Sequence, residues 1–166
     1  TPTVPTFADP PPGPHRFLGL DGFIHQSDDL RWWHGFDRLA ISLRLPVFRG
    51  LAVTIGRQAI AWGYGEIFRP ADRFAPERPI EFIRAHAAGV DAVDVRLPLG
   101  PASEVRAVLL PSERAADVTA LMRAEVQVAG IDLAATTGYE RGRGLFGLGS
   151  RVAFGPVGLE GEGVVF

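Results

Sequence analysis

The residues best suited to chemistry are charged side chains that alternate with aliphatic ones along several short segments. In residues 93–97, Asp94 and Arg96 occupy one parity while valine and leucine fill the other; residues 103–109 repeat the pattern with Glu104 and Arg106. Charges of both signs on one face would line a wet, ion-paired surface, and rings of such charges set ion preference in aqueous channels. We predict a charged, pore-lining surface made of Arg38, Arg44, Arg57, Asp94, Arg96, Glu104, Arg106, Arg123, Glu125 and Asp132.

Other reactive residue types form no recognisable catalytic or metal site in the sequence. The chain has no cysteine, and Ser150 lacks the Gly-x-Ser-x-Gly setting of a hydrolase nucleophile. The glycine-rich run 142–149 is not followed by the Gly-Lys-Ser/Thr of a phosphate-binding loop. We therefore expect no enzymatic activity, no cofactor and no bound metal. The histidines are scattered at spacings that match no metal site: His15, His25, His34 and His86.

The elements that would position the charged residues are β-strands, because a period of two gives each strand one apolar and one polar face. An alternative for 112–123 is a capped helix, but the alternation that follows favours a strand entered through a short helical turn. A weak strand is also predicted at 17–24, followed by a polar, aromatic stretch at 26–35. The main strands are predicted at 37–45, 51–62, 89–98, 103–110, 118–128, 131–138, 145–154 and 159–166.

The connections between these strands alternate in length. Short ones are predicted around 46–50, 99–102, 129–130 and 155–158, and longer ones around 63–88, 111–117 and 139–144. Alternation of this kind is typical of an antiparallel up-and-down meander that crosses a membrane, with short turns on one side and larger loops on the other. The fold class that we predict is all-β: a meander of about eight strands that is part of a transmembrane β-barrel.

The aliphatic parity, which includes Leu43, Ile55 and Val95, is predicted to face lipid, because charges are nearly absent from it within the strands. Gly56 is the one predicted break in register. A bulge there would turn Arg57 inward and turn Ile60 and Trp62 outward. Trp62 would then join an aromatic girdle at the rim of the barrel, together with Tyr64, Phe68, Tyr139 and Phe146.

Composition restricts the class of protein further. The 166 residues are 46% hydrophobic with a net charge of -2, which excludes a disordered chain and a protein that coats nucleic acid. No apolar run approaches the ~20 residues of a spanning helix, and no signal peptide is visible, so export is inferred only. We divide the chain into a Pro-rich lead-in at 1–16 and a β-barrel segment at 17–166.

Three elements in the chain resemble, in order, a family of bacterial porin-like outer-membrane barrels. They are a "GRQ-x-I-x-WG" strand at Gly56–Gly63, a "P-x-D-x-F-x-P" loop at Pro70–Pro76, and a "GVDA" strand at Gly89–Ala92. Family members are longer, so the chain is similar to an internal part of such a barrel. The resemblance implies a bacterial outer-membrane location and passive passage of small solutes or ions, with membrane lipid as the surrounding partner and no nucleic acid. Two alternatives stay open: a non-conducting structural or interaction barrel whose loop at 63–88 contacts a partner or plugs the lumen, and a soluble β-domain that binds a ligand on its charged face.

Overall fold

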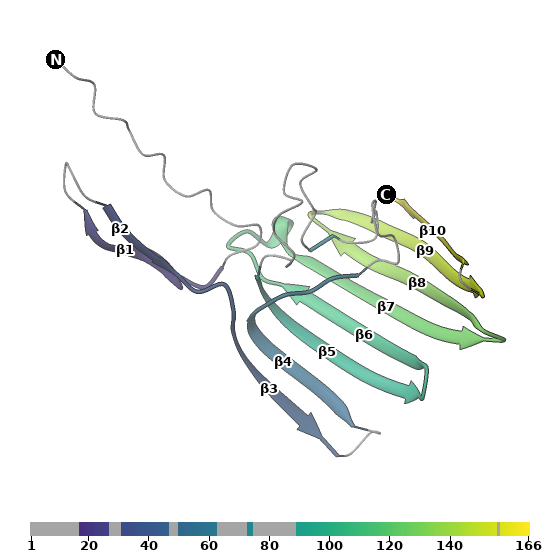
Figure 1. Ribbon diagram of the computed structural model, residues 1–166. Helices are drawn as coiled ribbons and strands as arrows, with labels where there is room; N and C mark the ends of the chain where they lie inside the picture. Colours follow the sequence, from purple (N-terminus) through teal and green to yellow (C-terminus); the bar gives the residue numbers. More distant parts are fainter. Residues whose placement is uncertain (1–16, 27–30, 47–49, 63–72, 75–88, 156) are drawn as a thin grey trace.

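Where the structure describes the chain, it forms two antiparallel sheets and almost no helix (Figure 1). The computed structural model describes residues 17–26, 31–46, 50–62, 73–74, 89–155 and 157–166. Within these residues a small sheet pairs β1 with β2, and a large sheet joins eight strands in the order of the sequence, from β3 to β10. The elements are β1 (Asp21–Gln26), β2 (Arg31–Gly35), β3 (Leu39–Leu45), β4 (Leu51–Gln58), β5 (Val90–Gly100), β6 (Ser103–Leu110), the 3₁₀ turn η1 (Ala115–Asp117), β7 (Thr119–Val128), β8 (Ile131–Glu140), β9 (Arg143–Phe154) and β10 (Val157–Val165).

The prediction of an antiparallel, all-β meander is confirmed. Each of the eight predicted main strands has a counterpart in the large sheet, and each pairs with its neighbours in sequence. The segment before β7 forms only the short turn η1 and then a strand, as predicted, because Thr119, Leu121 and Arg123 alternate with residues of the other face. The sheet is open, however: among the described strands, β3 and β10 each have a single neighbour. The described residues include no helix long and apolar enough to cross a membrane.

The connection between β8 and β9 differs from the prediction of a longer loop at 139–144. The two strands extend to Glu140 and from Arg143, and only Arg141 and Gly142 join them, with φ of 48° and 81°. Two successive residues with positive φ make the tight hairpin turn that matches strand twist. Ala129 and Gly130 turn the same way between β7 and β8, with φ of 52° and 81°. The predicted strict alternation of short and long connections is therefore wrong at this hairpin.

The N-terminal part of the chain also departs from the prediction. The weak strand expected at 17–24 lies at Asp21–Gln26, and its partner Arg31–Gly35 falls in the polar, aromatic stretch at 26–35, for which no strand was predicted. Aromatic residues favour β-strands, so Trp32 and Trp33 are consistent with a strand here. The prediction relied on alternation of apolar and polar residues, which this segment lacks. The predicted Pro-rich lead-in at 1–16 lies outside the described residues.

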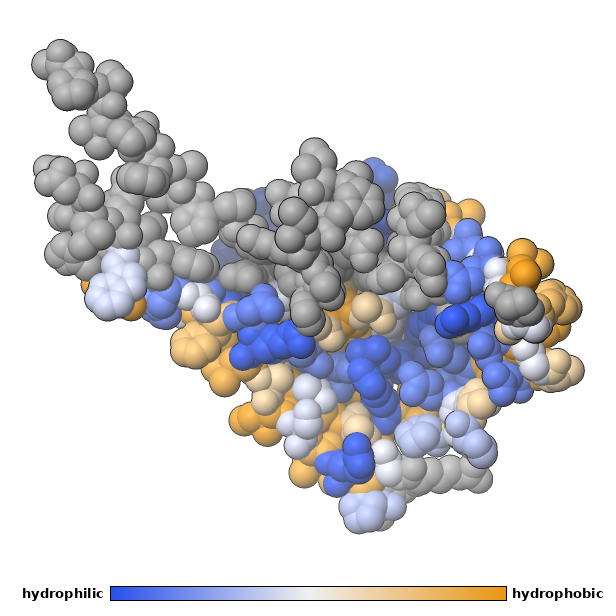
Figure 2. Space-filling view, viewed as in Figure 1, coloured by the Kyte–Doolittle hydropathy of each residue, from blue (hydrophilic) through white to orange (hydrophobic). Residues whose placement is uncertain are grey.

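The two faces of the large sheet have opposite character. Register places Val53, Val95 and Ala107 in one row across β4, β5 and β6, all on the apolar parity, and this apolar face continues from β3 to β10. Its side chains are widely exposed, Ile41 to 81% and Leu159 to 58%. The other parity forms the polar face. Figure 2 shows hydrophilic residues gathered over the middle of the visible surface and hydrophobic residues along its margins.

Replacing Gly138 with alanine should destabilise the sheet. Gly138 has φ of 148°, and a Cβ there would lie 2.1 Å from the carbonyl oxygen of Ala120 on the neighbouring strand. The backbone conformation alone costs a non-glycine residue about 1–3 kcal/mol, so we expect a loss of at least that size in the free energy of unfolding. Urea titration of the folded chain in detergent micelles would measure it.

Gly144→Ala is the matched control, because Gly144 lies in the adjacent strand with nothing within 4 Å of its Cβ position. Its effect should stay within about 0.5 kcal/mol. Equal effects of the two substitutions would contradict the steric explanation.

Candidate functional site

The polar face carries nearly all of the predicted pore-lining residues. Cross-strand register sets Arg96 opposite Arg106, and Arg106 opposite Arg123, so three arginines form a row across β5, β6 and β7. The next row sets Glu104 opposite Glu125. Like charges directly opposite each other are unfavourable, so each row needs counter-charges from the neighbouring rows.

The carboxylate of Asp94 supplies the central counter-charge. Arg106 donates from Nε to Oδ1 at 2.7 Å and from Nη2 to Oδ2 at 2.8 Å, a bidentate pair, and Arg96 donates from Nε to Oδ2 at 3.3 Å. Arg123 pairs with Glu125 two residues along its own strand, donating from Nε to one carboxylate oxygen. Asp94 and Arg106 are 2% and 8% exposed. Two-point, charge-assisted hydrogen bonds of this kind fix the orientation of both side chains.

Further polar contacts extend over both ends of this face. At one end Arg73 donates to Glu140 from Nε to Oε2 at 3.0 Å, and its guanidinium lies 5.2 Å from the ring centroid of Phe166. At the other end Gln127 donates to Asp132 at 2.7 Å. Neither Arg73 nor Glu140 was predicted as a site residue. Arg73 comes from the long connection after β4, where alternation gives no signal.

The two predicted residues near β3 lie at the margin of the face. Arg44 is an exposed residue of β3 on the polar parity. Arg38 comes just before β3, with Nε 3.7 Å from Asp37 Oδ2. The structure thus brings Asp94, Arg96, Glu104, Arg106, Arg123, Glu125 and Asp132 together on one continuous face and leaves these two arginines at its edge.

An apolar cluster covers the end of the polar face where β4 ends and β5 begins. Ile60, Trp62 and Phe74, from the connection that follows β4, pack with residues of that face, including Val108 and Leu121. The rings of Trp62 and Phe74 meet edge to face at 4.7 Å, and the Arg106 guanidinium lies 5.7 Å from the Trp62 ring centroid.

This placement corrects the prediction that Ile60 and Trp62 point outward. The expected bulge at Gly56 is absent: pairing runs without a shift from Leu51 to Gln58, and the strand ends there. After Gln58 the chain crosses onto the polar face and packs there, which leaves Trp62 only 3% exposed. Of the other predicted girdle residues, Tyr139 and Phe146 are exposed on the apolar face, and Tyr64 and Phe68 lie outside the described residues.

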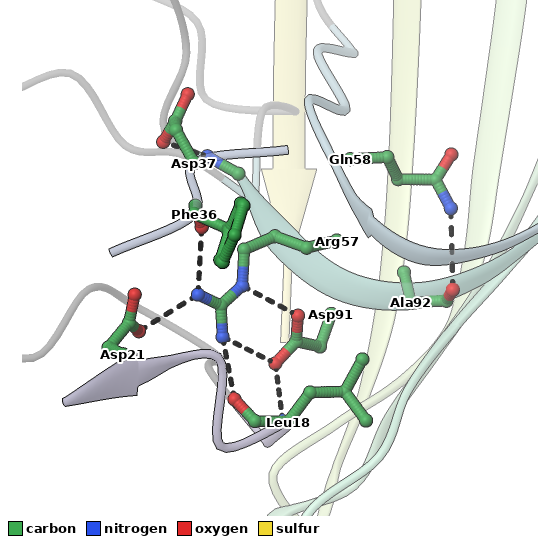
Figure 3. A network of polar contacts seen from close by, with 9 residues as sticks. Leu18, Asp21, Phe36, Asp37, Arg57, Gln58, Asp91 and Ala92 are labelled. Carbon is green, nitrogen blue, oxygen red and sulfur yellow. Dashed lines mark hydrogen bonds and ion pairs between the residues drawn. The ribbon is translucent and has the colours of Figure 1, made fainter. Parts of the chain in front are cut away.

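Arg57 is the one predicted pore-lining residue that lies on the opposite face. Because register is unbroken, it shares the parity of Val53 and Ile55 and stands opposite Asp91. Its side chain is fully buried beneath the segment that leads into β1 and the residues that follow β2 (Figure 3). The prediction that Arg57 turns into the charged face is therefore wrong.

A dense set of hydrogen bonds compensates the burial of Arg57. Its Nε donates to Asp91 Oδ1 at 2.8 Å and its Nη2 to Asp91 Oδ2 at 3.1 Å. Its Nη1 donates to Asp21 at 2.8 Å and to the Phe36 carbonyl at 2.9 Å, while Nη2 also reaches the Leu18 carbonyl at 2.7 Å. Asp91 in turn accepts from the Leu18 amide at 2.6 Å. We call these five residues the Arg57 node.

Gly89 makes room for the Arg57 node. A Cβ at this position would lie 1.8 Å from the Asp37 carbonyl oxygen and 2.9 Å from Arg57 Cγ. Its amide also donates to Asp37 Oδ1 at 3.2 Å. The segments Gly56–Gly63 and Gly89–Ala92, two of the three elements of the family resemblance, thus supply Arg57, Gly89 and Asp91 to one packing arrangement.

No family model, curated protein or solved structure matches the chain. The resemblance to porin-like barrels consequently stays a prediction. Within the part of the chain that the structure describes, no group of three or more metal-ligating side chains comes together. What the described site offers is a charged surface with fixed ion pairs, backed by an exposed apolar face.

Proposed function

We propose that the chain forms part of a porin-like β-barrel in a bacterial outer membrane, and that small solutes or ions pass along its polar face. The observation that carries this proposal is the apolar face, which is exposed on the outer strands β3 and β10 as well as on β7 and β8 between them. Contiguous exposed apolar surface of this extent marks contact with a membrane or a partner. Lipid is the solvent that suits a surface with almost no charge within its strands.

The polar face would then border the lumen. Its side chains are held in pairs of opposite sign, such as Asp94 with Arg106 and Glu125 with Arg123. Paired charges still project a local field, but the two signs largely offset each other. We therefore expect conduction with weak ion selectivity.

Membrane fractionation is the first test. The chain, expressed with an export signal in a Gram-negative host, should be found in the outer-membrane fraction and require detergent for extraction. Recovery of a folded, water-soluble chain would overturn the proposal and favour the soluble domain that binds a ligand on its charged face.

A non-conducting barrel is the second candidate, and one observation favours it. Ile60, Trp62 and Phe74 place two described parts of the long connection after β4, residues 60–62 and 74, on the polar face, where a lumen would be. A connection held there would narrow or plug the pore. Planar-bilayer recording separates the two candidates, because a plugged barrel inserts without conducting.

Arg96→Ala should shift the ion preference toward cations without loss of folding. The Arg96 side chain is 49% exposed, and Asp94 keeps its bidentate partner Arg106 when Arg96 is removed. Removing one unit charge changes local ion energies by roughly 1 kcal/mol at 4 Å in water, so the permeability ratio should change by up to about fivefold. Reversal potentials under a salt gradient would measure the change.

Arg106→Ala is the contrasting variant. It leaves the carboxylate of Asp94, 2% exposed, with only the longer contact to Arg96, so the yield of folded protein should fall. An unchanged reversal potential in Arg96→Ala, with normal folding of Arg106→Ala, would contradict the assignment of this face to the lumen.

A further inference from the structure

The charges on the polar face lie in rows of opposite sign that follow one another along the strands. The arginine row of β5, β6 and β7 continues to Arg44 on β3, because register sets Ala52 of β4 between Arg44 and Arg96. The next row, toward the turn between β5 and β6, holds Glu104 and Glu125. Residues of one face repeat at every second position, so the two rows lie about 6.6–6.8 Å apart along the strands.

The arginine row has an excess of positive charge at Arg96. Asp94 is shared by Arg96 and Arg106, so one carboxylate is the partner of two guanidinium groups. Arg106 contacts both carboxylate oxygens at the shorter distances, whereas Arg96 makes one contact of 3.3 Å, from Nε. The Arg96 side chain is 49% exposed. Its two Nη groups can therefore donate to a carboxylate that does not belong to the protein.

The glutamate row has an excess of negative charge at Glu104. Register sets Glu104 opposite Glu125, and Glu125 accepts from Arg123. Within the part of the chain that the structure describes, no hydrogen bond or ion pair reaches the Glu104 carboxylate, and the residue is only partly buried. A carboxylate opposite a like charge is unfavourable, so a cation supplied by a solute would stabilise Glu104.

Arg96 and Glu104 are diagonal neighbours on one face of a strand pair. Pro98, two residues after Arg96, stands opposite Glu104. Diagonal neighbours in an antiparallel pair lie about 7–8 Å apart, which lets two long side chains reach the same solute. Two charge-assisted hydrogen bonds of about 2.8 Å each, with the ammonium and carboxylate of an α-amino acid between them, span roughly 8–9 Å. The two side chains thus suit such a solute in both sign and spacing.

We propose that Arg96 and Glu104 form a binding site for zwitterionic solutes of the α-amino-acid type. Arg96 donates hydrogen bonds to the carboxylate of the solute, and the ammonium of the solute donates to Glu104. A simple ion satisfies only one of the two side chains, so the site favours solutes that carry both charges. This inference deepens the proposed function and rests on it, since it names a class of solute that would pass along the polar face.

Titration with L-alanine tests the site on the folded chain in detergent micelles. Backbone amide NMR signals around Arg96 and Glu104 should shift and reach saturation as L-alanine is added. Lactamide, a neutral compound of similar size, should give no saturable shift. N-Acetylalanine keeps only the carboxylate and alaninamide only the ammonium, so each should bind roughly fivefold more weakly than L-alanine.

Glu104→Gln should weaken the binding of L-alanine roughly fivefold without weakening that of N-acetylalanine, which has no ammonium. The chain should tolerate this change, because it removes a like charge opposite Glu125. Glu160→Gln is the matched control: it removes a carboxylate that pairs with Arg151 on the distant strands β9 and β10, and it should leave binding unchanged. Arg96→Ala should show the reverse pattern, with weaker binding of L-alanine and unchanged binding of alaninamide.

Two results would overturn the proposal: equal affinities for L-alanine, N-acetylalanine and lactamide, and equal affinities of Glu104→Gln and Glu160→Gln for L-alanine. Membrane fractionation and bilayer recording test the proposed function separately. A chain that conducts but does not prefer L-alanine overturns the binding site alone. A water-soluble chain that binds L-alanine with the expected pattern supports the binding site and overturns the membrane barrel.

Discussion

Arg57→Met is expected to lower the free energy of unfolding by about 3–5 kcal/mol, the usual cost of removing one partner from a buried ion pair. The substitution leaves the Asp91 carboxylate, 1% exposed, with the Leu18 amide and without its guanidinium. It also removes the donors to Asp21 and to the carbonyls of Phe36 and Leu18. Urea titration in detergent micelles, followed by tryptophan fluorescence, would measure the loss.

Two further variants test whether the loss of stability in Arg57→Met comes from the buried ion pair. Arg151→Met removes an ion pair with Glu160 in which the arginine is 54% exposed, so it should cost no more than about 1 kcal/mol. The double variant Arg57→Met/Asp91→Leu removes both buried charges and should recover much of the stability lost in the single variant. An effect of Arg57→Met no larger than that of Arg151→Met would show that the Arg57 node does not hold the N-terminal hairpin to the sheet.

Val95→Arg is expected to prevent insertion into a bilayer. Val95 lies on the apolar face of a central strand, in the row between Val53 and Ala107. An arginine near the middle of the bilayer costs about 2–4 kcal/mol on the lipid side of a barrel. The fraction of chain that folds into lipid vesicles, read from gel mobility before and after heating, would report the defect.

The matched control places the same side chain one strand away on the other face. Thr54→Arg introduces an arginine on the polar face, where register sets it opposite the carboxylate of Asp94. We expect this variant to insert normally. If Val95→Arg inserted normally and Thr54→Arg failed to insert, the polar face would be the one that contacts lipid. That result would overturn the proposed function.

The strands and their faces could be predicted because the signal is local. In β5 and β6 the alternation of Val93, Val95 and Ala107 with Asp94 and Arg106 defines both the strand and its two sides, and consecutive strands pair with little help from distant residues. Seven of the ten predicted site residues therefore lie together within the polar face.

Arg57 could not be placed in the same way, because its surroundings come from elsewhere in the chain. A lone arginine on an apolar parity suggested a break in register at Gly56, whereas the structure keeps the register and covers the arginine with Leu18, Asp21 and Phe36. Trp62 was misplaced for the same reason: strand alternation cannot reveal that the chain leaves the sheet after Gln58 and folds onto the polar face. The tight turn through Arg141 and Gly142 was missed because glycine and polar residues suit turns and loops of several lengths.

The Arg57 node also sets an order on how the molecule assembles. Every pairing in the large sheet joins neighbours in sequence, and apart from β4 with β5, which the long connection separates, each hairpin can form from a short stretch of chain. The node differs, since the hydrogen bond from Leu18 to Asp91 spans 73 residues and closes a long loop. Arg57 gains all of its hydrogen-bond acceptors only after β4 has paired with β5 and the β1–β2 hairpin has packed against these two strands. The β1–β2 hairpin therefore docks fully only after β4 and β5 have paired, and its docking reports that these two strands are in register.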